Sequence, residues 1–117
     1  IKKAIGENEY NSHLFRFPGG LAGGKYASIK SQANELLEQN NIAHVDWNAL
    51  NKDAEGKKKN ADELVQCVKE SVEVLGPNAD SVVLLMHDTY GKEETVKALS
   101  QIIEYLQGKG FEFRTIK

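Results

Sequence analysis

The sequence predicts an α/β fold made of parallel βαβ units, and three observations support this prediction. Short apolar segments alternate along the chain with longer segments of helical periodicity. Residues 81–86 (SVVLLM) form a continuous apolar run, which is typical of a strand covered on both faces. Glycine, proline or paired asparagine residues separate many of these segments. Strands that alternate with helices in this way favour a parallel sheet with right-handed crossovers.

The N-terminal half predicts one strand–helix–strand unit. Residues 13–17 have the composition of a short strand, which Pro18 and the following glycines interrupt. Residues 25–40 predict a helix, because apolar side chains recur there at helical spacing. Residues 42–47 predict a second strand, and residues 48–59 a polar turn region. The apolar positions of the helix are Tyr26, Ile29, Ala33, Leu36 and Leu37.

The middle of the chain predicts a second helix with well-marked ends. Asn60 is a typical N-cap residue, and Glu63 three residues later completes a capping box. Gly76 and Pro77 end the helix. The residues that it is expected to bury are Leu64, Val65, Val68, Val72 and Leu75.

The C-terminal part predicts a strand, a helix and a last strand. The apolar run 81–86 is the strand, and residues 92–107 show helical periodicity. Gly108 and Gly110 break this helix, and residues 111–116 predict the last strand. The residues that the helix is expected to bury are Val96, Leu99, Ile102, Ile103 and Leu106.

Composition limits the possible classes of function. A chain of 117 residues is at most one domain with a single core. The net charge of −2 argues against a dominant nucleic-acid-binding surface, and Lys57–Lys59 are interpreted as a solvated loop. The single cysteine, Cys67, excludes an internal disulfide and is interpreted as structural. No apolar run approaches the length of a membrane span.

Candidate functional residues follow the predicted strands, because ligands of parallel α/β folds bind outside the carboxyl ends of the strands. Arg16 lies near the end of the first strand, and its planar fork could hold a carboxylate or form a structural ion pair. Trp47 ends the second strand, and Asp53 follows in its loop. His44 and Asp46 share one face of that strand, where local packing is favoured over a metal site because no third ligand has suitable spacing.

His87 follows the apolar strand directly and is the most suggestive candidate. An imidazole in this position can act as a general acid or base, because its ordinary pKa lies near neutrality. The alternative is that Asp88 or Thr89 simply caps the next helix. The sequence supports the two interpretations about equally.

The glycine-rich segment 17–28 (FPGGLAGGKYAS) has three interpretations. Gly19 and Gly20 expose backbone N–H groups, as an oxyanion site requires, but the same pair is typical of a turn with positive φ. Gly19, Gly24 and Lys25 also fit the template of a phosphate-binding loop. Tyr26 stands where that template needs a small hydroxyl, so a nucleotide site is the weakest of the three and Tyr26 is expected to face the core.

Taken together, three motifs resemble the later motifs of the polysaccharide deacetylases, the NodB-homology proteins of carbohydrate esterase family four. They are RFPGG at residues 16–20, VDWN at residues 45–48 with Asp53 in the following loop, and LLMHD at residues 84–88. The resemblance extends over essentially the whole chain. It implies a distorted (β/α) barrel that hydrolyses N- or O-acetyl groups of a polymer such as peptidoglycan or chitin, with a divalent metal, commonly zinc. It also implies an extracellular or cell-surface location.

The resemblance implies three catalytic residues in this chain. His87 would protonate the departing amine, and Asp53 would pair with His87 to favour the protonated imidazole. Arg16 would hold the aspartate that acts as the catalytic base.

The resemblance also implies a set of substrate-binding residues. The N–H of Gly19 would help to bind the oxyanion beside Gly20, and Leu85 would line the acetyl pocket. Trp47 belongs to the same predicted set. Leu50 and Ala54 replace the first aspartate and the tryptophan of the family's DxxDW motif, which would leave the pocket wall more open.

The metal ligands and the catalytic base of the family are not found in this sequence and would precede Ile1. Residues 1–117 are therefore expected to be the C-terminal part of one deacetylase domain, inactive alone and beginning inside a helix over residues 1–6. Such a chain is expected to pair with the missing N-terminal half or with a second copy of itself. The alternative is a non-catalytic glycan-binding or structural module that lacks the metal site.

Overall fold

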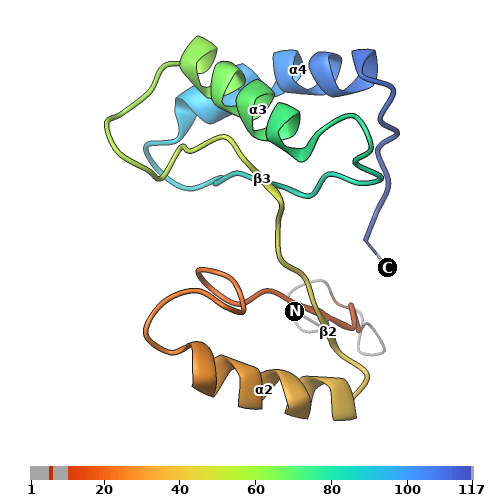
Figure 1. Ribbon diagram of the computed structural model, residues 1–117. Helices are drawn as coiled ribbons and strands as arrows, with labels where there is room; N and C mark the ends of the chain where they lie inside the picture. Colours follow the sequence, from red (N-terminus) through yellow and green to blue (C-terminus); the bar gives the residue numbers. More distant parts are fainter. Residues whose placement is uncertain (1–5, 7–10, 117) are drawn as a thin grey trace. The chain divides into compact units, whose positions relative to one another are not determined.

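The computed structural model describes residue 6 and residues 11–116, and the chain divides into two compact units (Figure 1). One unit ends at Asp46 and also includes Thr115 and Ile116, and the other runs from Trp47 to Arg114. Apart from Gly6, the predicted helical start over residues 1–6 lies outside the described residues. Each unit contains one pair of parallel strands joined by a helix.

The first unit contains β1 (Leu14–Phe15), α2 (Ala27–Gln39) and β2 (Ala43–His44). The two strands are parallel, with Leu14 opposite Ala43 and Phe15 opposite His44. The predicted order of strand, helix and strand is therefore confirmed. Each strand has two residues, shorter than the predicted segments, because the hydrogen-bonded ladder extends no further than this pairing.

The inward face of helix α2 agrees only in part with the one that its apolar residues predict, since Ala33 and Leu37 are half-buried. Asn34 is its buried residue, and Ala27, Lys30 and Leu37 share that face as half-buried residues. The predicted apolar positions Ile29 and Leu36 are more than half exposed. The expectation that Tyr26 faces the core is wrong, because Tyr26 is the N-cap residue and its side chain is 53% exposed.

The second unit contains β3 (Ala49–Leu50), α3 (Ala61–Leu75), β4 (Leu84–Leu85) and α4 (Glu93–Gly108). Strands β3 and β4 are parallel, with Ala49 opposite Leu84 and Leu50 opposite Leu85. The prediction of an uninterrupted polar turn region over residues 48–59 is therefore wrong. Two apolar residues between asparagines are too short a signal to predict a strand without its partner.

Helix α3 agrees closely with its prediction. The Asn60 side chain accepts a hydrogen bond from the Glu63 N–H (2.9 Å), and the Glu63 carboxylate accepts one from the Asn60 N–H (2.9 Å). This is the predicted capping box, which satisfies donors that the first turn leaves unpaired. Gly76 follows the last helical residue with a φ of 82°, a conformation that glycine adopts without strain.

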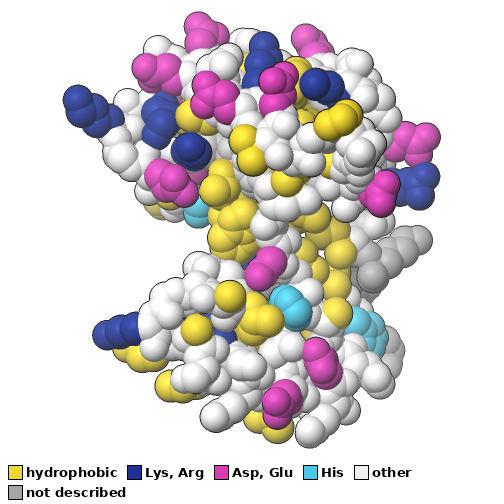
Figure 2. Space-filling view, viewed as in Figure 1, with side chains coloured by type: hydrophobic (Ala, Val, Ile, Leu, Met, Phe, Trp, Pro, Cys, Tyr) yellow, Lys and Arg dark blue, Asp and Glu magenta, His cyan; other side chains and the backbone are white. Residues whose placement is uncertain are grey.

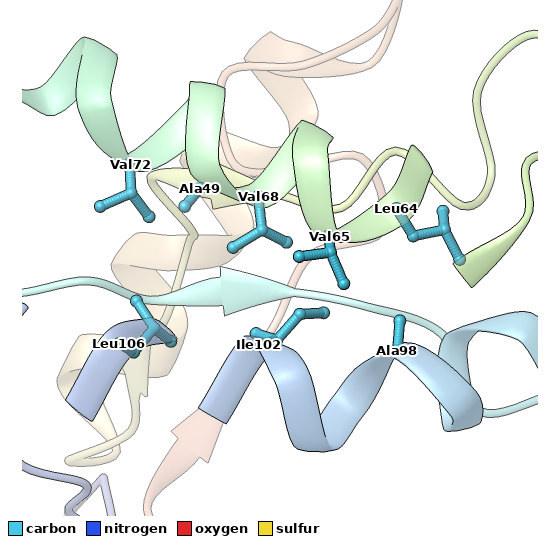
Figure 3. Close-up of a cluster of buried hydrophobic side chains, with 8 residues drawn as sticks. All are labelled: Ala49, Leu64, Val65, Val68, Val72, Ala98, Ile102 and Leu106. Carbon is cyan, nitrogen blue, oxygen red and sulfur yellow. The ribbon is translucent and has the colours of Figure 1, made fainter. Parts of the chain in front are cut away.

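The core of the second unit lies mainly between α3 and α4 (Figure 3). Helix α4 contributes Ala98, Ile102 and Leu106, whereas the predicted Val96 and Leu99 are exposed. The prediction is therefore confirmed for Ile102 and Leu106 and wrong at the start of the helix, where Thr95 and Ala98 take the inward positions. The buried residues of this core are Ala49, Leu64, Val65, Val68, Val72, Ala98, Ile102 and Leu106.

Two predicted strands differ from the observed segments. Residues 82–86 are half-buried, so the prediction of a strand fully covered on both faces is not met within the described residues. Residues 111–116 form no strand, and none of the described strands shares a hydrogen-bonded ladder with them. Phe111 nevertheless packs against the core, and its N–H donates to the Leu106 carbonyl (3.1 Å).

The surface carries charges of both signs. Figure 2 shows acidic and basic side chains interspersed over the unit that contains α3 and α4. It also shows hydrophobic side chains at the surface of the unit that contains α2. Among the helices of the described residues, none has the length and apolar character needed to cross a membrane.

Candidate active site

Asp53 and His87 form a hydrogen-bonded pair at the carboxyl ends of β3 and β4. The Nδ1 atom of His87 lies 2.7 Å from Oδ1 of Asp53. The two residues are brought together because β3 and β4 are parallel neighbours, and each residue follows its strand by two or three positions. The Asp53 side chain is 4% exposed and the His87 side chain 36% exposed. The pair therefore has a buried carboxylate and an imidazole that a ligand can reach.

Asp53 is held through its backbone as well as through its carboxylate. Its N–H donates to Oδ1 of Asn51 (3.1 Å), and its carbonyl accepts from the ammonium group of Lys92. Oδ2 of the carboxylate accepts from the backbone N–H of His87 (2.9 Å) and from the hydroxyl of Thr95 (2.8 Å). These partners lie on the β3 loop, the end of β4 and the start of α4, so three parts of the unit fix one side chain.

The environment of Asp53 determines its ionisation. Burial by itself raises the pKa of this carboxyl group, but hydrogen bonds from His87 and Thr95 outweigh burial and leave the pKa below its ordinary value of 3.8. An ionised carboxylate only accepts hydrogen bonds, so Nδ1 of His87 must carry the proton that lies between the two residues. Nε2 is consequently the ring nitrogen that remains for a ligand.

The alternative role of Asp88 or Thr89 as a helix cap is wrong. The N-cap residue of α4 is Lys92, and no side chain caps this helix. Thr89 instead takes part in a turn, in which its carbonyl accepts from the Lys92 N–H (3.2 Å). Capping therefore does not account for the polar residues that follow β4.

The glycine loop, which we define as residues 18–24, follows β1 in the first unit. Gly19 and Gly20 have φ values of 75° and 81°, which confirms the interpretation of this pair as a turn with positive φ. The N–H of Gly20 donates to the Phe17 carbonyl (2.9 Å), so it is committed to the turn. The N–H of Gly19 is the one of this pair that is left as a candidate oxyanion donor.

Lys30 of α2 holds the glycine loop from inside. Its ammonium group donates to the carbonyls of Pro18 (2.7 Å), Gly20 (3.0 Å) and Gly23 (2.9 Å). A side chain at position 23 would clash, since a Cβ atom there would lie 2.0 Å from the Gly19 carbonyl oxygen. The loop is thus a closed turn around an ammonium group.

Asp46 also stabilises the glycine loop, by accepting a backbone hydrogen bond from it. Both of its carboxylate oxygens lie 3.2 Å from the N–H of Leu21. His44 instead lies against an aromatic side chain, with its ring centroid 6.5 Å from that of Phe17. Within the part of the chain that the structure describes, no group of three potential metal ligands is found. His44 and Asp46 thus both have contacts within the first unit.

The predicted site residues are divided between the two units. Asp53, His87, Leu85 and Trp47 lie in the second unit, where Leu85 is in β4 and Trp47 is half-buried just before β3. The exposed Arg16 and the glycines lie in the first unit. The structure brings Asp53 and His87 into direct contact, and the convergence of both groups on one substrate stays a prediction.

Four residues of this arrangement were not predicted: Lys30, Asn51, Lys92 and Thr95. Lys30 and Thr95 carried a usable sequence signal, because each lies seven residues, or two helical turns, before an apolar residue that was predicted to be buried, Leu37 and Ile102. Asn51 had no such signal, because its role depends on the short strand β3.

Comparison with known proteins supports the resemblance. No family model and no curated protein sequence matches this chain. Solved structures do match, among them that of a Streptococcus mutans CE4 esterase, with 28% identity and a TM-score of 0.83 over 99% of this chain and 48% of that one. Another is the catalytic domain of peptidoglycan N-acetylglucosamine deacetylase from Eubacterium rectale, with 27% identity and a TM-score of 0.79 over 96% of this chain and 50% of that one.

These matches confirm the predicted resemblance to the deacetylases of carbohydrate esterase family four. The mixed α/β structure with short parallel strands resembles the fold of those enzymes, which is a distorted barrel. The chain spans about half the length of both structures, which is consistent with a C-terminal half of a deacetylase domain.

Proposed function

We propose that this chain is part of a metal-dependent polysaccharide deacetylase that hydrolyses N-acetyl or O-acetyl groups on a glycan such as peptidoglycan or chitin. The observation that carries the proposal is the buried Asp53 carboxylate 2.7 Å from a reachable imidazole of His87. The similarity to a CE4 esterase and to a peptidoglycan N-acetylglucosamine deacetylase over nearly the whole chain supports it. The peptidoglycan deacetylase among them supports a cell-envelope location and an acetylated polysaccharide as substrate.

In this proposal His87 is the general acid. Cleavage of an acetamide requires a proton on the departing nitrogen, because an amide anion is a very poor leaving group. Asp53 holds Nδ1, so Nε2 of the protonated ring is the atom that donates to the leaving amine. Asp53 keeps this orientation because its carboxylate remains ionised at neutral pH.

The other predicted residues bind and orient the substrate in this proposal. Leu85 precedes His87 by two residues, and Leu85 and Trp47 supply apolar surface for the acetyl group and the sugar. The Gly19 N–H stabilises the oxyanion, and Arg16 holds the catalytic-base carboxylate of the complete domain. The Lys30 clamp supports this role by keeping the glycine loop in one shape.

In this proposal the divalent metal, zinc by resemblance, takes its ligands from a part of the domain other than the residues described here. Among these residues no three His, Cys, Asp or Glu side chains lie close enough together to hold an ion. The metal therefore depends on a complementary segment or second chain, and we assign no step of the reaction through it. The isolated chain is accordingly proposed to be inactive.

A chimera tests the proposal. This chain would replace the matching half of the Streptococcus mutans CE4 esterase, and acetate release from chitooligosaccharides would be measured with added zinc. We expect the chimera to be active and His87→Ala to lower kcat about 10²- to 10⁴-fold, the usual contribution of a general acid. His13→Ala, a change of the same residue type at an exposed position, is the matched control.

Two results would contradict the proposal. An active chimera in which His87→Ala has no effect would remove the general-acid role. A folded but inactive chimera, together with metal-independent binding of chitooligosaccharide by this chain, would favour the non-catalytic glycan-binding module. If ATP stabilised the folded chain against thermal unfolding, that result would instead support the interpretation of the glycine-rich segment as a nucleotide site.

A further inference from the structure

We propose that Thr95 is a positioning residue for the Asp53–His87 pair. Its hydroxyl donates a hydrogen bond to Oδ2 of Asp53 and thereby leaves Oδ1 to accept from the His87 imidazole. The inference deepens the proposed function, on which its catalytic meaning rests. Its structural basis is the 2.8 Å hydrogen bond from the Thr95 hydroxyl to Asp53.

The carboxylate of Asp53 needs such a partner because rotation about its last torsion is only weakly restricted. The N–H of Asp53 donates to Oδ1 of Asn51, and its carbonyl accepts from Lys92, so these two contacts hold the backbone of the residue. The backbone N–H of His87 does act on Oδ2, but it belongs to the same residue as the ring that must be oriented. Thr95 is the partner that comes from a separate element, α4.

The place of Thr95 in α4 supports this role. The inward face of the helix is otherwise apolar, with Ala98, Ile102 and Leu106 packed in the core. Thr95 is 6% exposed, so its hydroxyl has little access to water and depends on an acceptor inside the protein. A valine of nearly the same shape would fill this position without that requirement. The hydroxyl is therefore the part of the side chain that needs a functional explanation.

The ratio of the two neutral tautomers of the His87 imidazole reports how strongly Asp53 orients this ring. In the chain labelled with ¹⁵N at histidine, the nitrogen shifts of the neutral ring report the ratio of Nδ1–H to Nε2–H. We expect Nδ1–H to dominate in the wild type, because Asp53 accepts from Nδ1. Thr95→Val should lower the ratio about two- to tenfold, the range expected for the loss of one hydrogen bond. Thr95→Ser should restore it, because it restores the hydroxyl.

Internal and matched controls separate positioning from a general loss of stability. His13 and His44 lie in the other unit, so their tautomer ratios should not change in any of the variants. Ile102→Val removes one methylene group from the same buried helix face without touching Asp53, and it should leave the His87 ratio unchanged. If Thr95→Val is folded and retains the wild-type ratio at His87, the proposal is wrong.

A measurement on the wild type covers the case in which Thr95→Val does not fold. The hydroxyl proton of Thr95 should exchange slowly with water and show a nuclear Overhauser effect to the backbone N–H of His87, since both donate to Oδ2. A rapidly exchanging hydroxyl would overturn the proposal. Neither measurement needs enzymatic activity. Failure of the chimera would therefore refute the proposed function, and an unchanged tautomer ratio would refute the role of Thr95.

Discussion

The two units have the same order of strand, helix and strand, but different contacts stabilise them. In the second unit, α3 and α4 bury an apolar core that includes Val68 and Ile102 (Figure 3). In the first unit, α2 buries Asn34, and its ordered loop is held by Lys30 and Asp46 through hydrogen bonds to the backbone. One unit therefore depends mainly on the hydrophobic effect and the other more on polar contacts.

The two candidate site loops have one feature in common, which is that each is contacted by a helix of its own unit. In each unit a polar residue on the inward face of a helix reaches the loop after the first strand. Lys30 of α2 reaches the glycine loop, and Thr95 of α4 reaches Asp53. The Lys30 contacts lie near solvent, whereas Asp53 and Thr95 are buried. If the hydrogen bond between Thr95 and Asp53 is lost, water should therefore replace it less readily than it replaces the contacts of Lys30.

The largest expected effect is in the core of the second unit. Ile102→Ala should lower the free energy of unfolding by about 2–5 kcal/mol, because it leaves a cavity at a side chain that is 1% exposed. Urea unfolding followed by circular dichroism would measure this. Val74→Ala on the exposed side of α3 is the control and should change stability little. Equal losses at both positions would show that α3 and α4 do not pack as described.

Asp53 should give the next largest effect, with a dependence on pH. Asp53→Asn should destabilise the chain by about 1–3 kcal/mol at neutral pH, because buried donors lose a charged acceptor. The folded-state pKa of Asp53 lies below 3.8, so its contribution is present above the unfolded pKa and is lost as the pH falls through the folded value. The difference between wild type and variant should therefore shrink below pH 3.8.

Unfolding curves at several pH values would test this prediction. Asp80→Asn, at an exposed position, should show little difference from wild type at any of them. A wild-type advantage over Asp53→Asn that persisted unchanged at the lowest pH would contradict an ionised Asp53 in the folded state.

Lys30 should have a smaller effect that is confined to the first unit. Lys30→Met keeps the length of the side chain but removes the donor to three carbonyls, and we expect a loss of about 1 kcal/mol. Amide hydrogen exchange should become faster over the glycine loop and remain unchanged around Asp53. Lys25→Met, at a neighbouring exposed lysine, should leave the exchange rates as in the wild type.

The smallest effect is expected on the exposed face of α2. Leu36→Ala should change the free energy of unfolding by less than about 0.5 kcal/mol, because Leu36 is 62% exposed and alanine favours the helix. Unfolding at two protein concentrations would sharpen the comparison. A larger loss that grows with concentration would mean that a second copy of the chain covers this face.

The sequence predicted most of the helical structure but not all of the strands. Helix α3 was predicted within a residue at both ends, because the Asn60–Glu63 box and Gly76 are local signals. Strand β3 was missed, because a two-residue strand is defined by its partner rather than by its own composition. The expected strand at 111–116 failed for the same reason, since no described strand pairs with it.

The sequence by itself determined where the helices begin and end, and which residues resemble a deacetylase site, because capping, periodicity and motifs act over a few residues. The sequence also predicted the face that α3 buries, but only the tertiary structure decided the full inward faces of α2 and α4. In α2 that face includes Lys30, which reaches a loop 7 to 12 residues earlier, and in α4 it includes Thr95, which reaches Asp53 at a separation of 42 residues. Asp53 and His87 likewise meet only because two short strands pair in parallel. Such contacts depend on the spatial arrangement of segments, which a local pattern does not specify.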